Sequence, residues 1–182
     1  FYAFNALIKN NSQYSFLYGP KKSGKSYLAQ IWLKQNNAVQ INHNNKLFLN
    51  NDKNILIDVI LLFKEENIFH IVNNCFLNDL KILITSSNKI NEIKFKFDDL
   101  SSRLKTFSNL EINQPNDEML LSILTKLLID KQFIINSNDI FEFILRRVDR
   151  SYKGIYDIVN KLDVLSLEKK RQLTIPLIKE IL

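Results

Sequence analysis

One short turn constrains the fold of this chain more than any other feature of the sequence. It fits the pattern G-x-x-x-x-G-K-[ST] at every position and reads Gly19-Pro20-Lys21-Lys22-Ser23-Gly24-Lys25-Ser26. The apolar segment Ser15–Tyr18 precedes it, and an amphipathic helical pattern begins near Gly24. Main-chain amides and the positive end of a helix can then surround a phosphate, which glycine lets approach closely. We therefore predict a phosphate-binding loop between a first strand and a first helix.

The chemistry of such a loop assigns roles to its residues. Lys25 is expected to reach the β- and γ-phosphates, and the Ser26 hydroxyl to hold Mg²⁺. The turn and the adjoining Tyr27 form the predicted contact with ADP or ATP. A site of this kind also needs a carboxylate on a neighbouring strand, and the run Asn54–Asp58 ends in one, 32 residues after Ser26. We predict Asp58 as the second metal ligand and the catalytic acid, although an Asp can also simply close a strand.

The residue after Asp58 bears on hydrolysis. Many ATPases of this build carry a Glu there to activate water, whereas this chain has Val59. Glu65 and Glu66 follow closely, but we expect them to form the solvated first turn of a helix. Hydrolysis is therefore expected to be slow or to depend on residues that a partner supplies, and whether the chain is an enzyme is left open.

The order of apolar segments predicts an α/β fold. Short runs rich in Ile, Val, Leu and Phe alternate with helical stretches, which indicates a parallel five-stranded sheet with helices on both faces. The expected strands are Ser15–Tyr18, Ala38–Ile41, Asn54–Asp58, Lys81–Thr85 and Ser108–Ile112. After Pro115 the pattern is entirely helical. We therefore expect two domains, a nucleotide-binding α/β domain at 1–114 and a small helical lid at 115–182.

Apolar spacing predicts which helix faces are buried. In the first domain the expected core positions are Leu28, Ile31 and Trp32, then Ile68, Phe69, Val72, Cys75 and Phe76. In the second they are Leu120, Ile123, Leu124, Leu127, Leu128; Ile140, Phe141, Ile144, Val148; Ile155, Ile158, Val159, Leu162; and Ile178, Ile181, Leu182. Asn116 is the expected N-cap of the first lid helix, Ser137 or Asn138 starts the second, and the fourth follows Thr174.

Composition excludes several classes of protein. Of 182 residues, 46% are hydrophobic and 24% charged, with only three Gly and three Pro, which is typical of a folded chain. No run approaches the roughly 18 apolar residues of a membrane span. The single Cys75 cannot form an internal disulfide, so we expect a cytoplasmic protein without membrane association. His43, His70 and Cys75 match no metal spacing, and Cys75 is expected to be an inert core residue. The net charge of +6 leaves weak contact with DNA open.

Beyond these patterns, several segments resemble the AAA+ module of the bacterial replication initiator DnaA and its shorter relative Hda. They are YGPKKSGKSYLAQIW, ILID, ILITSS, FDDLSSRL and RQLTIPLIKEIL. The resemblance spans nearly the whole chain, and TIPLIKEIL with LDVLSLEKKRQL is closer to Hda. The initiator would continue beyond Leu182 into a DNA-binding domain. Asp58 follows Ser26 by only 32 positions, which also leaves little room for the extra helix that initiators use in filaments.

The resemblance implies further site residues. Arg103 matches the arginine that points at nucleotide held by a neighbouring AAA+ subunit, where its planar fork can grip phosphate oxygens. The sensor arginine of the third lid helix falls at Lys153, with Arg150 as a competing candidate. The polar sensor after the fourth strand falls at Ser87 or Asn88. Lys153 retains charge but loses bidentate geometry, which suits a regulator better than a motor.

The resemblance thus implies an Hda-like regulator that binds adenine nucleotide, docks on a DnaA-type initiator and promotes hydrolysis of its ATP through Arg103. The sliding clamp of DNA polymerase is an implied second partner, and whether a clamp-binding peptide precedes Phe1 is left open, as is homo-oligomer formation. Three alternatives remain: a DNA-handling ATPase such as a helicase loader or truncated initiator, a small P-loop kinase, and an interaction module without nucleotide.

Overall fold

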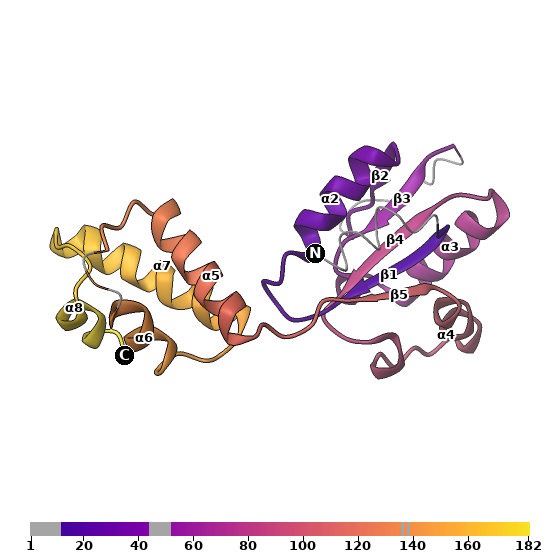
Figure 1. The fold of residues 1–182 in the computed structure, drawn as a ribbon. Coiled ribbons are helices and arrows are strands. Elements are labelled where there is room, and N and C mark those ends of the chain that lie inside the picture. The colour runs from indigo at the N-terminus through magenta and orange to yellow at the C-terminus, as the bar shows by residue number, and fades with distance from the viewer. Residues whose placement is uncertain (1–11, 44–51, 136, 138) are drawn as a thin grey trace. The chain divides into compact units, whose positions relative to one another are not determined.

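The computed structural model describes residues 12–43, 52–135, 137 and 139–182 (Figure 1). They divide into two compact units. One contains the described residues up to Gly19 together with Gly24–Ile112, and the other contains Pro20–Ser23 and Asn113–Leu182. The second unit therefore begins two residues before the expected boundary between 114 and 115.

The first unit is built on a five-stranded sheet in the order β2-β3-β4-β1-β5, and every pair is parallel. Each expected strand is present, with ends shifted by at most one residue. The bounds are β1 Tyr14–Tyr18, β2 Ala38–Gln40, β3 Asn54–Ile57, β4 Ile82–Ser86 and β5 Ser108–Glu111. Because β3 ends at Ile57, the predicted metal ligand Asp58 is the first residue beyond its strand.

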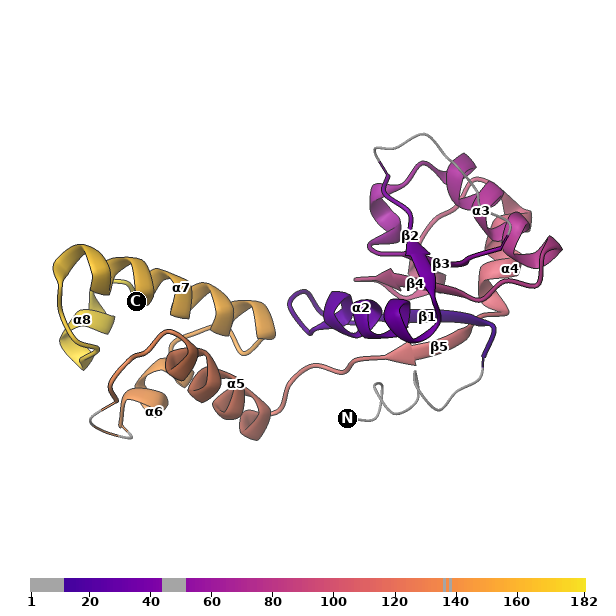
Figure 2. The ribbon, with the colours of Figure 1, turned by 90° about the horizontal axis from the view of Figure 1, so that it is seen from above.

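Alternate side chains of the strands face two separate cores, as expected for a parallel sheet covered on both sides. Helix α2 (Lys25–Gln35) packs on one face, where Ala29 and Trp32 meet Leu17, Leu56, Leu83 and Leu110. Helices α3 (Glu65–Leu77) and α4 (Asp98–Lys105) cover the other face, against Phe16, Ile55, Ile57, Ile82 and Ile84 (Figures 1 and 2). The predicted fold class is confirmed.

The helices of this unit follow the expected stripes with small differences. In α3, Ile68, Val72 and Cys75 are buried, while Phe69 and Phe76 are partly buried at the edge of the same core. In α2, the fully buried residue beside Trp32 is the small Ala29, and Ile31 remains partly exposed. Two 3-10 helices, η1 (Ile60–Leu62) and η2 (Ile90–Glu92), follow β3 and β4 and had no expectation from the sequence.

The second unit consists of helices α5 (Asp117–Asp130), α6 (Asp139–Leu145), α7 (Tyr152–Lys169) and α8 (Ile175–Lys179) around one apolar core. Asn116 caps α5, since its side chain accepts a hydrogen bond from Met119 N at 2.9 Å. Thr174 caps α8 through Leu177 N. Asn138, one of the two expected starts of α6, lies outside the described residues.

The expected core stripes of this unit are largely confirmed. Leu120, Leu124 and Leu128, then Ile140 and Ile144, then all four positions of α7 are buried, and Ile178 is too. The partly buried members are Ile123, Leu127, Phe141, Val148 and Ile181. Leu182 was predicted wrongly, because α8 ends at Lys179 and the Leu182 side chain is 46% exposed. No described helix combines the length and hydropathy that crossing a bilayer requires.

Candidate nucleotide-binding site

The predicted phosphate-binding loop joins β1 to α2, as its sequence requires. A side chain at Gly19 would collide with the end of β5, since a Cβ there would lie 2.6 Å from the Ile112 carbonyl oxygen. Gly24 is the N-cap of α2 in the left-handed region, at φ 89°, which glycine adopts most readily. A Cβ on Gly24 would meet no heavy atom within 4 Å. The first glycine therefore permits close packing, and the second turns the chain into the helix beside open space.

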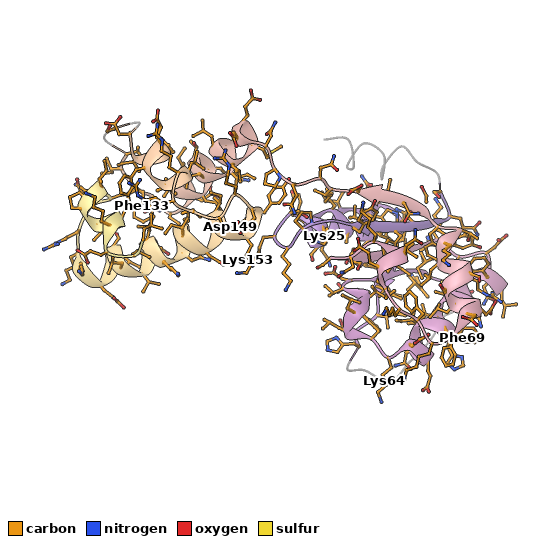
Figure 3. The ribbon with its side chains drawn as sticks, turned by 90° about the horizontal axis from the view of Figure 1, so that it is seen from below. Lys25, Lys64, Phe69, Phe133, Asp149 and Lys153 are labelled. Carbon is orange, nitrogen blue, oxygen red and sulfur yellow. The ribbon has the colours of Figure 1, made fainter. Side chains whose placement is uncertain are left out.

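Lys25 lies in the first turn of α2 (Figure 3), and its side chain folds back over the loop. Its Nζ donates a hydrogen bond to the Gly19 carbonyl at 2.9 Å. Partial burial lowers the pKa of Lys25, while the negative charge of Asp58 acts in the opposite direction. The ammonium group and the carboxylate are thus close enough to interact, and the half-buried cation is placed to bind an anion above the loop.

The other residues of the loop are more exposed. Ser26 is solvent-exposed in the first turn of α2, so its hydroxyl is accessible to a metal ion, and the Tyr27 side chain is 72% exposed. Ser23 N donates to Pro20 O at 3.3 Å, which closes the turn, while Lys21 and Lys22 are exposed. Oxygen ligands such as the Ser26 hydroxyl and the Asp58 carboxylate suit Mg²⁺.

Asp58 is held by the strand beside it. The Thr85 hydroxyl donates to Asp58 Oδ1 at 2.6 Å, and Val59 N donates to Thr85 Oγ1 at 2.8 Å. Strands β3, β4 and β1 are neighbours, so their carboxyl ends lie along one edge of the sheet, where ligands of open α/β sheets bind. That edge therefore carries Asp58, Thr85 and the start of the loop.

Thr85 was not among the residues that the sequence analysis singled out. Its two candidates for the polar sensor follow β4: Ser87 is half-buried, and Asn88 is exposed, with its N–H donating to the Ser86 hydroxyl at 3.0 Å. That assignment stays a prediction. In the sequence, Thr85 is marked only as a hydroxyl residue at the end of the apolar run Ile82–Ile84. Nothing in the sequence connects it with Asp58.

Val59 adopts the left-handed conformation, with φ 61° and ψ 73°. This is an uncommon backbone for a β-branched residue, and such outliers cluster at functional sites. Glu65, expected to be a solvated residue, has a structural contact instead, because its carboxylate accepts a hydrogen bond from Phe97 N at 2.6 Å. It thereby ties the start of α3 to the start of α4.

Arg103 lies near the end of α4, where two contacts orient it. Its Nε donates to Asp99 Oδ2 at 3.1 Å, and its guanidinium lies over the Phe76 ring, 5.4 Å from the centroid. About a third of its side chain, 35%, is exposed. Among the described residues, the Arg103 side chain thus contacts its own helix through Asp99 and α3 through Phe76.

The remaining candidate cations lie in the second unit. Lys153 is in the first turn of α7 (Figure 3). It pairs with Asp157 one turn later, which raises the pKa of Lys153 and lowers that of Asp157. Arg150 pairs with Asp117 at the start of α5. Both cations therefore have a partner within their own unit.

The sulfur and imidazole groups do not add to the site. Cys75 is fully buried, and desolvation raises the pKa of its thiol to about 12, so it stays protonated at neutral pH. Across the described ranges, no group of three or more His, Cys, Asp or Glu is placed to hold a metal ion.

Comparisons of the sequence and of the structure with known proteins show which proteins this chain is similar to. The family model of the Hda lid domain matches residues 117–182. DnaA of Buchnera aphidicola is 26% identical over the whole chain, which spans 48% of that protein. Domain III of Thermotoga maritima DnaA superposes with TM-score 0.76 and 18% identity, over 100% of this chain and 90% of that one. AMPPCP-bound DnaA from Aquifex aeolicus gives TM-score 0.66 and 18% identity, over 92% and 61% of the two chains.

The covered parallel sheet, the loop after its first strand and the helical unit that follows give the fold of AAA+ proteins, which the superposed structures share. Residues 117–182 thus match the lid domain of Hda, and over its whole length the chain is similar to the replication initiator DnaA.

Proposed function

We propose that this chain is an Hda-like regulator of replication initiation that binds ADP or ATP with Mg²⁺. The observation that carries the proposal is the loop at the end of β1, where Gly24 opens α2 and the half-buried Lys25 lies over Gly19 with Asp58 nearby. Amides at a helix N-terminus and a partly desolvated ammonium group together favour a di- or triphosphate.

The proposed roles follow the two domains that the sequence predicts. Residues 1–114 would bind the nucleotide through Gly19–Tyr27, with Ser26 and Asp58 holding Mg²⁺, and residues 115–182 would form the lid that supplies Lys153. AMPPCP is bound in the related Aquifex aeolicus DnaA, which supports an adenine nucleotide as ligand. A role in replication would also place the chain in the cytoplasm.

Binding without efficient turnover distinguishes a regulator from a motor. Val59 occupies the position where a water-activating Glu would be needed, and Glu65 bonds Phe97 N instead of serving the site. We therefore propose that the chain's own hydrolysis is slow. Its action would be exerted on a DnaA-type initiator, with the sliding clamp on DNA as a second partner.

Arg103 is the group proposed to act on the initiator's nucleotide. Its contacts with Asp99 and Phe76 fix the direction of the side chain, about a third of which stays exposed. A guanidinium that is already oriented loses less conformational entropy when it binds phosphate oxygens across an interface. This supports a contribution in trans from α4.

The first experiment is calorimetric titration with ADP and with ATP in Mg²⁺. Lys25→Ala is expected to weaken binding by about 10- to 100-fold, since a hydrogen bond to a charged group contributes roughly 1.5–3 kcal/mol. Lys34→Ala is the matched control, because it removes the same charge from an exposed position in the last turn of the same helix, outside the loop. Equal affinities for the parent and Lys25→Ala would contradict the proposed site.

The second experiment mixes the chain with an ATP-loaded initiator and a clamp loaded on DNA, and follows ATP turnover. Arg103→Ala is expected to abolish the stimulation without changing folding. Lys105→Ala removes an exposed charge from the same helix and is expected to stimulate as the parent does. Stimulation by Arg103→Ala at the parental level would refute the role in trans.

The net charge of +6 favours one other candidate, a DNA-handling AAA+ ATPase such as a helicase loader or a truncated initiator. That candidate predicts DNA binding whose log affinity falls linearly with log salt concentration. Fluorescence anisotropy of single- and double-stranded oligonucleotides at several salt concentrations separates it from the regulator.

A further inference from the structure

Thr85 is a buried hydroxyl at an apolar place in the fold. It follows Ile82, Leu83 and Ile84 on β4 in the middle of the sheet, and no part of it is exposed. A hydroxyl buried without a partner costs on the order of 1–3 kcal/mol. Thr85 avoids this cost because its oxygen takes part in two hydrogen bonds, and both connect it with the chain that leaves β3.

The two bonds define where the hydroxyl proton points. Val59 N–H donates to Oγ1 at 2.8 Å, so the oxygen acts as acceptor there. The hydroxyl hydrogen is then directed to Asp58 Oδ1, at the short distance of 2.6 Å that is typical of a hydroxyl donating to a carboxylate. The same side chain thus fixes the carboxylate of Asp58 and the backbone turn that follows it.

We propose that Thr85 is the positioning residue for magnesium in this chain. It acts through Asp58: by holding Oδ1, it presents the other carboxylate oxygen in one orientation, and by holding Val59 N it stabilises the left-handed turn beside that carboxylate. Groups that orient a metal ligand typically contribute 10- to 100-fold to metal affinity. The proposal rests on the proposed nucleotide site and adds to it a residue that contacts neither the nucleotide nor the metal.

Ser86 provides the matched control. It is the next residue of β4 and is also fully buried, but its hydroxyl accepts a hydrogen bond from Asn88 N and so belongs to the turn after the strand. Removing the Ser86 hydroxyl deletes a buried polar group from the same strand end without touching Asp58. A general effect of disturbing β4 would therefore appear in both variants, whereas an effect on magnesium would appear in only one.

The test measures ADP affinity by calorimetry over a range of Mg²⁺ concentrations, with EDTA as the metal-free reference. The quantity compared is the Mg²⁺ concentration that gives half of the metal-dependent gain in affinity. We expect Thr85→Val to raise it by about 10- to 100-fold while ADP affinity in EDTA stays parental. Ser86→Ala and Thr85→Ser, which keep the hydroxyl on residue 85, are expected to stay close to the parent.

Further variants keep the test decisive. In an Asp58→Asn background, Thr85→Val should cause no additional shift, because the carboxylate through which Thr85 acts is already lost. If Thr85→Val fails to fold, Thr85→Cys replaces it beside Thr85→Ser, since the two differ only in sulfur for oxygen, and only Thr85→Cys should require more Mg²⁺.

The outcomes separate this inference from the proposed function. A parent that binds ADP with a Mg²⁺ requirement unchanged in Thr85→Val overturns the role of Thr85 and leaves the nucleotide site intact. A parent that binds no ADP at any Mg²⁺ concentration overturns the nucleotide site, and the role of Thr85 with it.

Discussion

The two glycines of the phosphate-binding loop should respond differently to the same substitution, Gly19 mainly in stability and Gly24 mainly in nucleotide binding. A Cβ on Gly19 would lie 2.6 Å from the carbonyl oxygen of Ile112 and 2.9 Å from its Cβ. Ile112 cannot move away freely, because its N–H is hydrogen-bonded to Tyr18 O at 2.8 Å, next to the loop. Overpacking of this kind typically costs about 1–3 kcal/mol. Gly19→Ala should therefore lower the free energy of unfolding by about that amount.

Gly24→Ala should instead be mild for stability and severe for binding. At φ 89° an alanine costs roughly 1–2 kcal/mol, and the smaller entropy of the unfolded chain returns about 0.4–1 kcal/mol, so the net loss is about 1 kcal/mol. The new methyl group would meet no protein atom within 4 Å and would project into the open space beside the loop. We expect ADP affinity to fall about tenfold or more, equivalent to about 1.4 kcal/mol.

Urea unfolding followed by circular dichroism measures the first effect, and calorimetric titration of ADP measures the second. For a chain of this length, the stability loss in Gly19→Ala corresponds to a Tm lower by roughly 2–12 °C. If Gly19→Ala is as stable as the parent, the close approach of β5 does not require glycine. If Gly24→Ala binds ADP at parental affinity, the phosphates are not where the loop predicts.

Three further predictions concern other parts of the chain. The folded state keeps the Cys75 proton that the unfolded chain loses above pH 9, so unfolding free energy should fall by about 1.4 kcal/mol per pH unit from pH 9 to 12. Urea titrations at several pH values should show that this fall in unfolding free energy is absent in Cys75→Val. Val59→Gly should stay within about 1 kcal/mol of the parent in the same assay, because relief of left-handed strain offsets the added chain entropy; a loss above about 2 kcal/mol would contradict this. Asn116→Ala should destabilise α5 by about 1 kcal/mol, visible as faster hydrogen exchange at the Met119 amide, and unchanged exchange would exclude a capping role.

Much of the fold could be predicted because its signals are local. Each strand is a short apolar run between turns, and burial on both faces removes the need for alternation, so the runs were recognisable in isolation. Asn116 and Thr174 marked helix starts through side chains that bond to amides only three residues away. The ends of the helices were harder: α8 stops at Lys179, and no residue signal excluded Leu182 from its core stripe.

The site was predictable only in part, because only some of its contacts join residues that are close in the sequence. The loop is contiguous, so its spacing alone placed Gly24 at the start of α2 and Lys25 in its first turn. The contact between Thr85 and Asp58 joins residues 27 positions apart, and that between Glu65 and Phe97 N joins residues 32 apart. Neither pair has a spacing that a periodic pattern could reveal.

The amino-acid sequence by itself determined a phosphate-binding loop, a carboxylate at the end of an apolar strand and a change from strands to helices after Pro115, because each depends on neighbouring residues. The tertiary structure alone decided that β4 lies between β3 and β1. That order brings the Thr85 hydroxyl to Asp58, and it results from pairing and packing across the whole sheet, where the free energy is shared among distant residues and no short segment records it.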